Sequence, residues 1–158
     1  MTELLRAVIG ALSDELEAIE RRALSAAEGA THDESRPEGP KDTRGLETSY
    51  LAHGLAERAT ELQAEIHTIR FLQIARFDSA TPVSLGARIE LEDDEGERRV
   101  VALLPCAGGL EIELDEARIR IVTPRSPLGS AVLGKKVGDE IELRVRDRVR
   151  SFFVIGVT

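Results

Sequence analysis

Two stretches of heptad periodicity joined by a polar segment restrict this chain to very few folds. In both stretches apolar residues recur at alternating steps of four and three, which is the spacing of a coiled-coil seam. Two seams of similar length most simply bury each other when the chain folds back, so the pattern predicts an antiparallel coiled-coil hairpin of helices over residues 1–78. The seam residues are Leu5, Ile9, Leu12, Leu16, Ile19 and Ala23, then Leu55, Ala59, Leu62, Ile66 and Ile69.

The segment between the seams, residues 29–45, contains four carboxylates, two prolines and no large apolar residue. We predict a first helix from about Thr2 to Glu28, a second helix from near Asp42 and a tip loop at about residues 29–42. A solvated loop is ordinarily polar and Asp42 suits an N-cap, so the acidic residues of this loop can be explained by structure alone as well as by function. The acids at the tip are Asp33, Glu34, Glu38 and Asp42.

The second half of the chain changes from the helical period to a period of two. Apolar residues alternate from Val83 to Leu91, which predicts a strand with one buried face, and the domain boundary falls near residues 78–82. Ser126 and Pro127 can open a short helix that Gly134 can end. We therefore predict an α+β protein with a mainly antiparallel β domain over residues 80–158. Further strand-like runs are RRVVALL, LEIEL, RIRIV, DEIELRV and RVRSFFVIGV.

Composition excludes several classes of protein. A net charge of −8 and 3% aromatic residues argue against direct binding of nucleic acid. Such binding depends on clustered Lys and Arg side chains and on aromatic rings that stack on the bases. No apolar run approaches the ~20 residues of a membrane span, and the N-terminus lacks the pattern of a signal peptide. We predict a cytoplasmic protein without membrane contact.

The segment TPRSPLGSAVLGKKVGDEIEL resembles the signature of the C-terminal, FKBP-like domain of the GreA/GreB transcript-cleavage factors. The segment KDTRGLETSYLAHG is similar to the hairpin motif of that family, with Asp42, Arg44, Glu47 and Tyr50 as the matching residues. The resemblance implies a monomer that is not itself an enzyme and has no cofactor of its own. It implies that RNA polymerase is the partner and that nucleic acid is reached only through the elongation complex.

The resemblance also implies a division of labour between the two halves. The β domain holds the polymerase rim, and the loop of Ser126, Pro127, Leu128 and Gly129 belongs to the docking surface. The hairpin enters the secondary channel, where acids at its tip help to hold a second Mg²⁺ at the polymerase active site. Carboxylates suit this role because Mg²⁺ is a hard cation that prefers oxygen ligands.

The hairpin departs from the family pattern at one important place. If Asp42 matches the first catalytic acid, the second falls on Gly45, so the usual acidic pair is missing. Asp33, Glu34 and Glu38 can substitute from the loop, and the alternative is a regulator that occupies the channel without stimulating cleavage. An FKBP-type prolyl isomerase is a further alternative, but few aromatic residues are present to line a proline pocket.

Overall fold

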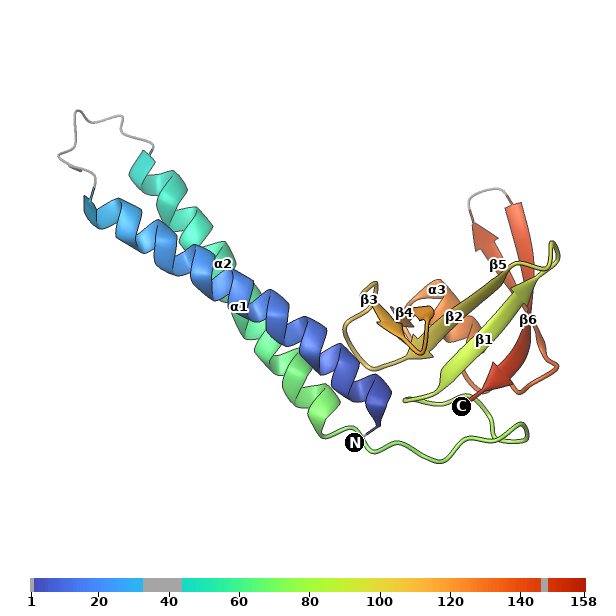
Figure 1. The fold of residues 1–158 in the computed structure, drawn as a ribbon. Coiled ribbons are helices and arrows are strands. Elements are labelled where there is room, and N and C mark those ends of the chain that lie inside the picture. Colours follow the sequence, from blue (N-terminus) through green and yellow to red (C-terminus); the bar gives the residue numbers. More distant parts are fainter. Residues whose placement is uncertain (1, 33–43, 146–147) are drawn as a thin grey trace. The chain divides into compact units, whose positions relative to one another are not determined.

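The computed structural model describes residues 2–32, 44–145 and 148–158 (Figure 1). The chain divides into two compact units, one of Ile9–His67 and the other of Met1–Val8 together with Thr68–Thr158. The α+β class predicted from the sequence is confirmed. The elements are α1 (Glu3–His32), α2 (Arg44–Arg70), β1 (Arg88–Asp93), β2 (Arg98–Leu103), β3 (Glu111–Leu114), β4 (Ala117–Val122), α3 (Pro127–Val132), β5 (Glu140–Val145) and β6 (Arg148–Val157).

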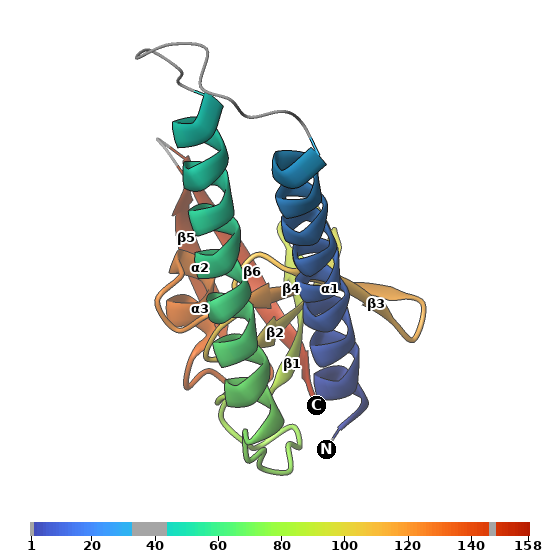
Figure 2. The same ribbon diagram turned by 90° about the vertical axis from the view of Figure 1, so that its left-hand side faces the viewer.

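Helices α1 and α2 lie side by side and run in opposite directions, as Figures 1 and 2 both show. Thr2 caps α1, since its carbonyl accepts the amide of Arg6 at 3.1 Å and its hydroxyl accepts the amide of Leu5 at 3.4 Å. The structure places the predicted seam in the interior of the hairpin. The buried seam residues are Leu5, Leu12, Ile19, Leu62, Ile66 and Ile69, and the other predicted members are half-buried.

The seam of α1 differs from the predicted series at its N-terminal end. Val8, which lies outside the predicted series, is fully buried, whereas the predicted Ile9 is only half-buried. Leu5, Val8 and Leu12 are three and four residues apart, so the coiled-coil spacing is kept and Val8 takes the seam position predicted for Ile9. Helix α1 also continues to His32, past the expected end at Glu28. The expected start of the second helix at Asp42 lies outside the described residues.

The six strands form one sheet in the order β3-β4-β2-β1-β6-β5. Every neighbouring pair is antiparallel except β2 and β4, which are parallel with Val100 opposite Ile119. The pairing of β1 with β6 shifts register between Glu90 and Leu91, which leaves Ile155 as the extra residue of a β-bulge. The mainly antiparallel domain with one short helix is thus confirmed, with one parallel pair that the sequence did not predict.

One face of this sheet carries the hydrophobic core that α3 covers. Val132 of α3 is buried in it, and Leu128 and Ala131 of the same helix pack against it from the edge. The alternating face predicted from Val83 onward lies in this core, apart from Leu85, which is only partly buried. The buried members are Val83, Ala87, Ile89, Leu91, Val101, Leu103, Val122, Val132, Ile141, Phe152, Val154 and Val157.

The predicted first strand is shorter than its alternating pattern. Strand β1 begins only at Arg88, because Gly86 has a φ of +93° and the amide of Ala87 closes a turn onto the carbonyl of Ser84 at 3.1 Å. A side chain at Gly86 would meet Ile74 at 2.6 Å, so glycine is required there for space as well as for conformation. The prediction that Val83 and Leu85 lie in a strand was therefore wrong, although Val83 is buried as expected.

A turn built on Asp78 precedes this segment. The Oδ1 atom of Asp78 accepts the hydroxyl of Thr81 at 2.6 Å and the amides of Ala80 and Thr81 at 3.0 and 2.8 Å. These hydrogen bonds, the hydroxyl of Thr81 first, lower the pKa of Asp78 below its ordinary value. The turn stands where the sequence places the change from helical to alternating periodicity.

Candidate functional site

The loop that enters α3 is held by the side chain of Ser126. Its Oγ accepts the amide of Gly129 at 3.1 Å and donates to the carbonyl of Thr123 at 2.8 Å. Ser126 has extended backbone angles, and Pro127 occupies the first helical position, as the sequence predicted. Because the hydroxyl is engaged on both sides within the chain, its role in the structure is to shape this loop.

Gly129 is the tightest point of the loop. A Cβ atom at this position would lie 2.0 Å from the carbonyl oxygen of Thr123 and 2.9 Å from Oγ of Ser126. The carbonyl is backbone and cannot turn aside as a flexible side chain can. Gly129 is therefore required so that α3 can approach the end of β4, and this requirement is independent of any partner.

The four predicted docking residues differ in what they offer to a partner. Pro127 is exposed, Ser126 and Leu128 are half-buried, and Gly129 is buried. Leu128 packs against the core, so it anchors α3 to the sheet. Leu133, at the C-terminal end of α3, is a large apolar residue with 46% of its surface exposed. The accessible apolar surface of α3 is therefore provided by Pro127 and Leu133, the second of which the sequence analysis missed.

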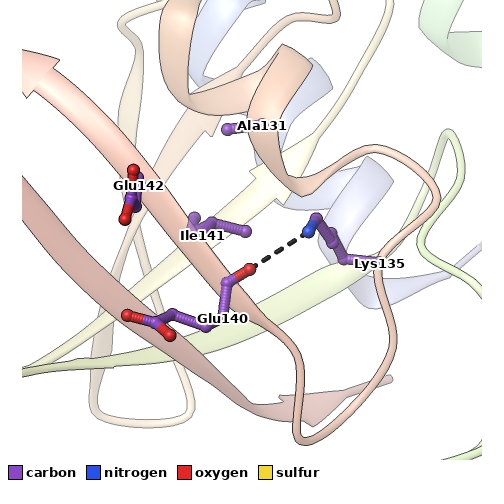
Figure 3. A pocket seen from close by; sticks show the side chains of 5 residues that line it. All are labelled: Ala131, Lys135, Glu140, Ile141 and Glu142. Atoms are coloured by element: carbon purple, nitrogen blue, oxygen red, sulfur yellow. Dashed lines mark hydrogen bonds between the residues drawn. The ribbon is translucent and has the colours of Figure 1, made fainter.

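A depression of about 410 Å³ lies between α3 and the edge strand β5 (Figure 3). Nζ of Lys135 donates to the backbone carbonyl of Glu140 at 3.1 Å across it, while the side chain of Glu140 points away from the lysine. None of the lining residues is aromatic, so the depression offers no aromatic proline pocket. The lining residues are Ala131, Lys135, Glu140, Ile141 and Glu142.

The tip acids predicted from the sequence, Asp33, Glu34, Glu38 and Asp42, lie outside the described residues. Their role therefore stays a prediction. Within residues 2–32, 44–145 and 148–158, three or more metal-binding side chains nowhere gather into a group able to hold an ion. In the same part of the chain, no helix combines the length and the apolar character needed to cross a membrane.

Comparison with known proteins identifies the β domain. Residues 78–158 match the family model "Transcription elongation factor, GreA/GreB, C-term". The transcription elongation factor GreA of Clostridium beijerinckii is 33% identical over 76 residues, which are 48% of this chain and 44% of that protein. The GreA of Jannaschia sp. is 24% identical over 156 residues, or 98% of this chain and 92% of that protein. The match thus spans less than half of the Clostridium relative and nearly all of the Jannaschia one.

Among solved structures, Gfh1 of Thermus aquaticus is 23% identical and covers 96% of this chain and 94% of its own, with a TM-score of 0.42. At that score the likeness adds nothing to the assignment, which stands on the sequence match. The matched segment contains the whole sheet and the serine-capped α3. The chain belongs to the GreA/GreB family.

Proposed function

We propose that this protein binds RNA polymerase and acts on elongation by inserting its helical hairpin into the secondary channel. The observation that carries the proposal is the family match over residues 78–158. The hairpin supports it, since α1 has 30 residues and, at 1.5 Å per residue, is about 45 Å long. A rod of that length can carry a short acidic segment deep into a channel that a globular domain cannot enter.

In this proposal the β domain docks through the exposed part of α3. Pro127 and Leu133 provide apolar contact, while Ser126 and Gly129 hold the helix in the conformation that presents them. A change of Pro127 to Glu would add a charge to the contact surface but leave the fold intact, because an acid suits the first turn of a helix. A change at Gly129 would instead disturb the helix itself.

The chemistry belongs to the polymerase and not to this chain. Tip carboxylates chosen from Asp33, Glu34, Glu38 and Asp42 would help to hold a second Mg²⁺ at the polymerase active site. Two metal ions stabilise the attacking and the leaving oxygen when RNA is cleaved in a backtracked complex. The chain would thereby stimulate cleavage without being an enzyme and without a cofactor of its own.

A second candidate function rests on the spacing of the acids. With Asp42 in the first acidic position of the family motif, Gly45 occupies the second. A hairpin without an acidic pair can still fill the channel and exclude other factors from it. This candidate is a regulator that occupies the channel and does not stimulate cleavage.

Transcript cleavage in a backtracked elongation complex separates these candidates. The comparison uses the wild-type protein, a variant with all four tip acids changed to Ala, Pro127→Glu, and Glu95→Gln as a control in the β1–β2 turn. Mg²⁺-dependent shortening of the RNA by the wild type, lost in the tip variant with binding retained, supports cleavage stimulation. Absence of cleavage together with competition against a GreA factor supports channel occupation.

Other outcomes of the same experiment count against the proposal. If neither cleavage nor competition is observed, polymerase is the wrong partner. If Pro127→Glu binds polymerase as tightly as Glu95→Gln, α3 is not the docking surface. A proline-peptide assay addresses the isomerase alternative, and we expect no turnover because the depression beside α3 has no aromatic lining.

A further inference from the structure

The β domain contains one complete site for a guanidinium group, formed by its own residues. On the core face of the sheet, Cζ of Arg99 lies 4.8 Å from the centroid of the Phe152 ring. Nη2 of the same arginine donates to Oδ2 of Asp93 at 3.3 Å, and Asp93 is the register partner of Phe152 on the neighbouring strand. The ring of Phe152 and the carboxylate of Asp93, its register partner, thus bind the guanidinium group of Arg99 together.

The next residue along β6 repeats this arrangement on the opposite face. Phe153 is 43% exposed, and its register partners are Glu92 on β1 and Glu140 on β5. Directly opposed residues of antiparallel strands have Cβ atoms about 4.5–5.5 Å apart, so an acidic side chain starts beside Phe153 on each neighbouring strand. Among the described residues, no cation lies over Phe153 in the way that Arg99 lies over Phe152.

One of the two carboxylates already accepts an arginine. Oε2 of Glu92 accepts a hydrogen bond from Nε of Arg98 at 2.8 Å, and the side chain of Arg98 is largely exposed. The carboxylate of Glu140 points away from Lys135, whose Nζ binds the backbone carbonyl instead. A guanidinium group placed over Phe153 can therefore bind the carboxylate of Glu140, while the carboxylate of Glu92, paired with Arg98, lies at the edge of the same site.

From this repetition we infer that Phe153, Glu92 and Glu140 form a receptor for an arginine side chain of a partner protein. The occupant is a protein and not a nucleic acid, since the carboxylate of Glu140 repels phosphate and the carboxylate of Glu92 is already paired with Arg98. Arginine is favoured over lysine because its planar group can stack on the ring and donate in parallel to a carboxylate. The sheet face is thus an interaction surface for a basic segment of a protein.

This inference does not rest on the proposed docking through α3. Helix α3 packs on the core face of the sheet, while Phe153 follows Phe152 and so points to the other face. A partner bound at Phe153 and a partner bound at Pro127 would occupy different surfaces. The two proposals can fail separately.

NMR titration of the full-length, ¹⁵N-labelled protein with the peptide acetyl-Gly-Arg-Gly-amide tests the inference. The matched probe replaces arginine by citrulline, which has nearly the same shape and no charge. We expect the arginine peptide to shift the amide signals around Phe153, Glu92 and Glu140 in a saturable manner, and the citrulline peptide to leave them unchanged. Phe153→Ser should abolish the shifts, and Leu24→Ser, which removes an exposed apolar side chain of α1, should retain them.

Glu140→Gln provides a second variant that keeps the size of the side chain and the aromatic ring. We expect it to weaken binding of the arginine peptide several-fold, with the remaining amide spectrum unchanged. Equal shifts with the citrulline peptide, shifts that persist in Phe153→Ser, or no localised shift in the wild-type protein would each overturn the inference. The polymerase experiments above do not depend on any of these results.

Discussion

Arg58 of α2 and Glu15 of α1 are joined by two hydrogen bonds to a single oxygen. Nε and Nη2 of Arg58 donate to Oε1 of Glu15 at 3.1 and 3.0 Å, and Nη1 donates to Oε2 of Glu61 at 3.1 Å. The hydrogen bond to Glu15 is the main reason that the pKa of Arg58 is raised above its ordinary value. This ion pair links the two helices beside the apolar seam and helps to fix their register.

We expect Arg58→Ala to lower the free energy of unfolding by only about 0.5–1 kcal/mol, because both partners are partly solvated. Thermal unfolding at low and high salt measures the effect, which should shrink as salt screens the pair. A double-mutant cycle with Glu15→Gln isolates the interaction. A coupling free energy of zero in low salt would show that the pair contributes nothing to the hairpin.

Two changes of glycine to alanine should alter the free energy of unfolding in opposite directions. Gly129→Ala would drive a methyl group into the carbonyl of Thr123, so we expect a loss of several kcal/mol, similar to severe overpacking of a core. Gly10 lies within α1, and a Cβ atom added there would have no heavy atom within 4 Å, so Gly10→Ala should gain about 0.5–1 kcal/mol from helix propensity. Chemical denaturation of both variants measures these values, and equal effects would contradict this account.

The turn at Asp78 should make a pH-dependent contribution to stability. Because its pKa is lower in the folded state than in the unfolded state, the contribution is complete above the unfolded pKa of about 4 and is lost as the pH falls through the folded pKa. We expect Thr81→Val, which removes the hydroxyl donor, to raise the pKa of Asp78, as followed by NMR of its carboxyl carbon. Thr81→Ser keeps the hydroxyl and should leave that pKa low.

The two-residue turn between β3 and β4 offers a stabilising change. Asp115 and Glu116 both have positive φ, of 52° and 61°, which suits a tight hairpin but strains a residue with a side chain. We expect Glu116→Gly to raise the free energy of unfolding by about 1 kcal/mol. Glu95→Gly, at a turn residue without positive φ, is the matched control, and a gain of the same size there would refute the conformational explanation.

The local features of the fold could be predicted because their causes lie close together in the sequence. Ser126 and Pro127 are adjacent and carry the information for the start of α3, and alternation sets the buried face of β5 through Ile141. The seam residues Leu12 and Leu62 were found by their period alone. In each case a pattern within one element decides which side faces the interior.

Features that depend on distant parts of the chain could not be predicted in this way. The parallel pairing of β2 with β4 and the late start of β1 depend on contacts such as the amide of Gly86 with the carbonyl of Leu103, at 2.8 Å. The placement of Phe153 opposite Glu92 and Glu140 depends on the register of three strands. Of the candidate site, the capping role of Ser126 was predicted, whereas the exposed position of Leu133 depends on how α3 meets the sheet.

The strand order described above also determines how quickly the β domain can assemble. Pairs β1–β2, β3–β4 and β5–β6 join neighbours in sequence and can close within roughly 1–10 μs as isolated hairpins. The pair β1–β6 joins Ile89 to Val157, so most of the domain must be gathered into one loop before it forms. We therefore expect this junction to govern the refolding rate of the domain. Substitutions beside the bulge at Ile155 should then slow refolding more than substitutions of equal cost in the three hairpins.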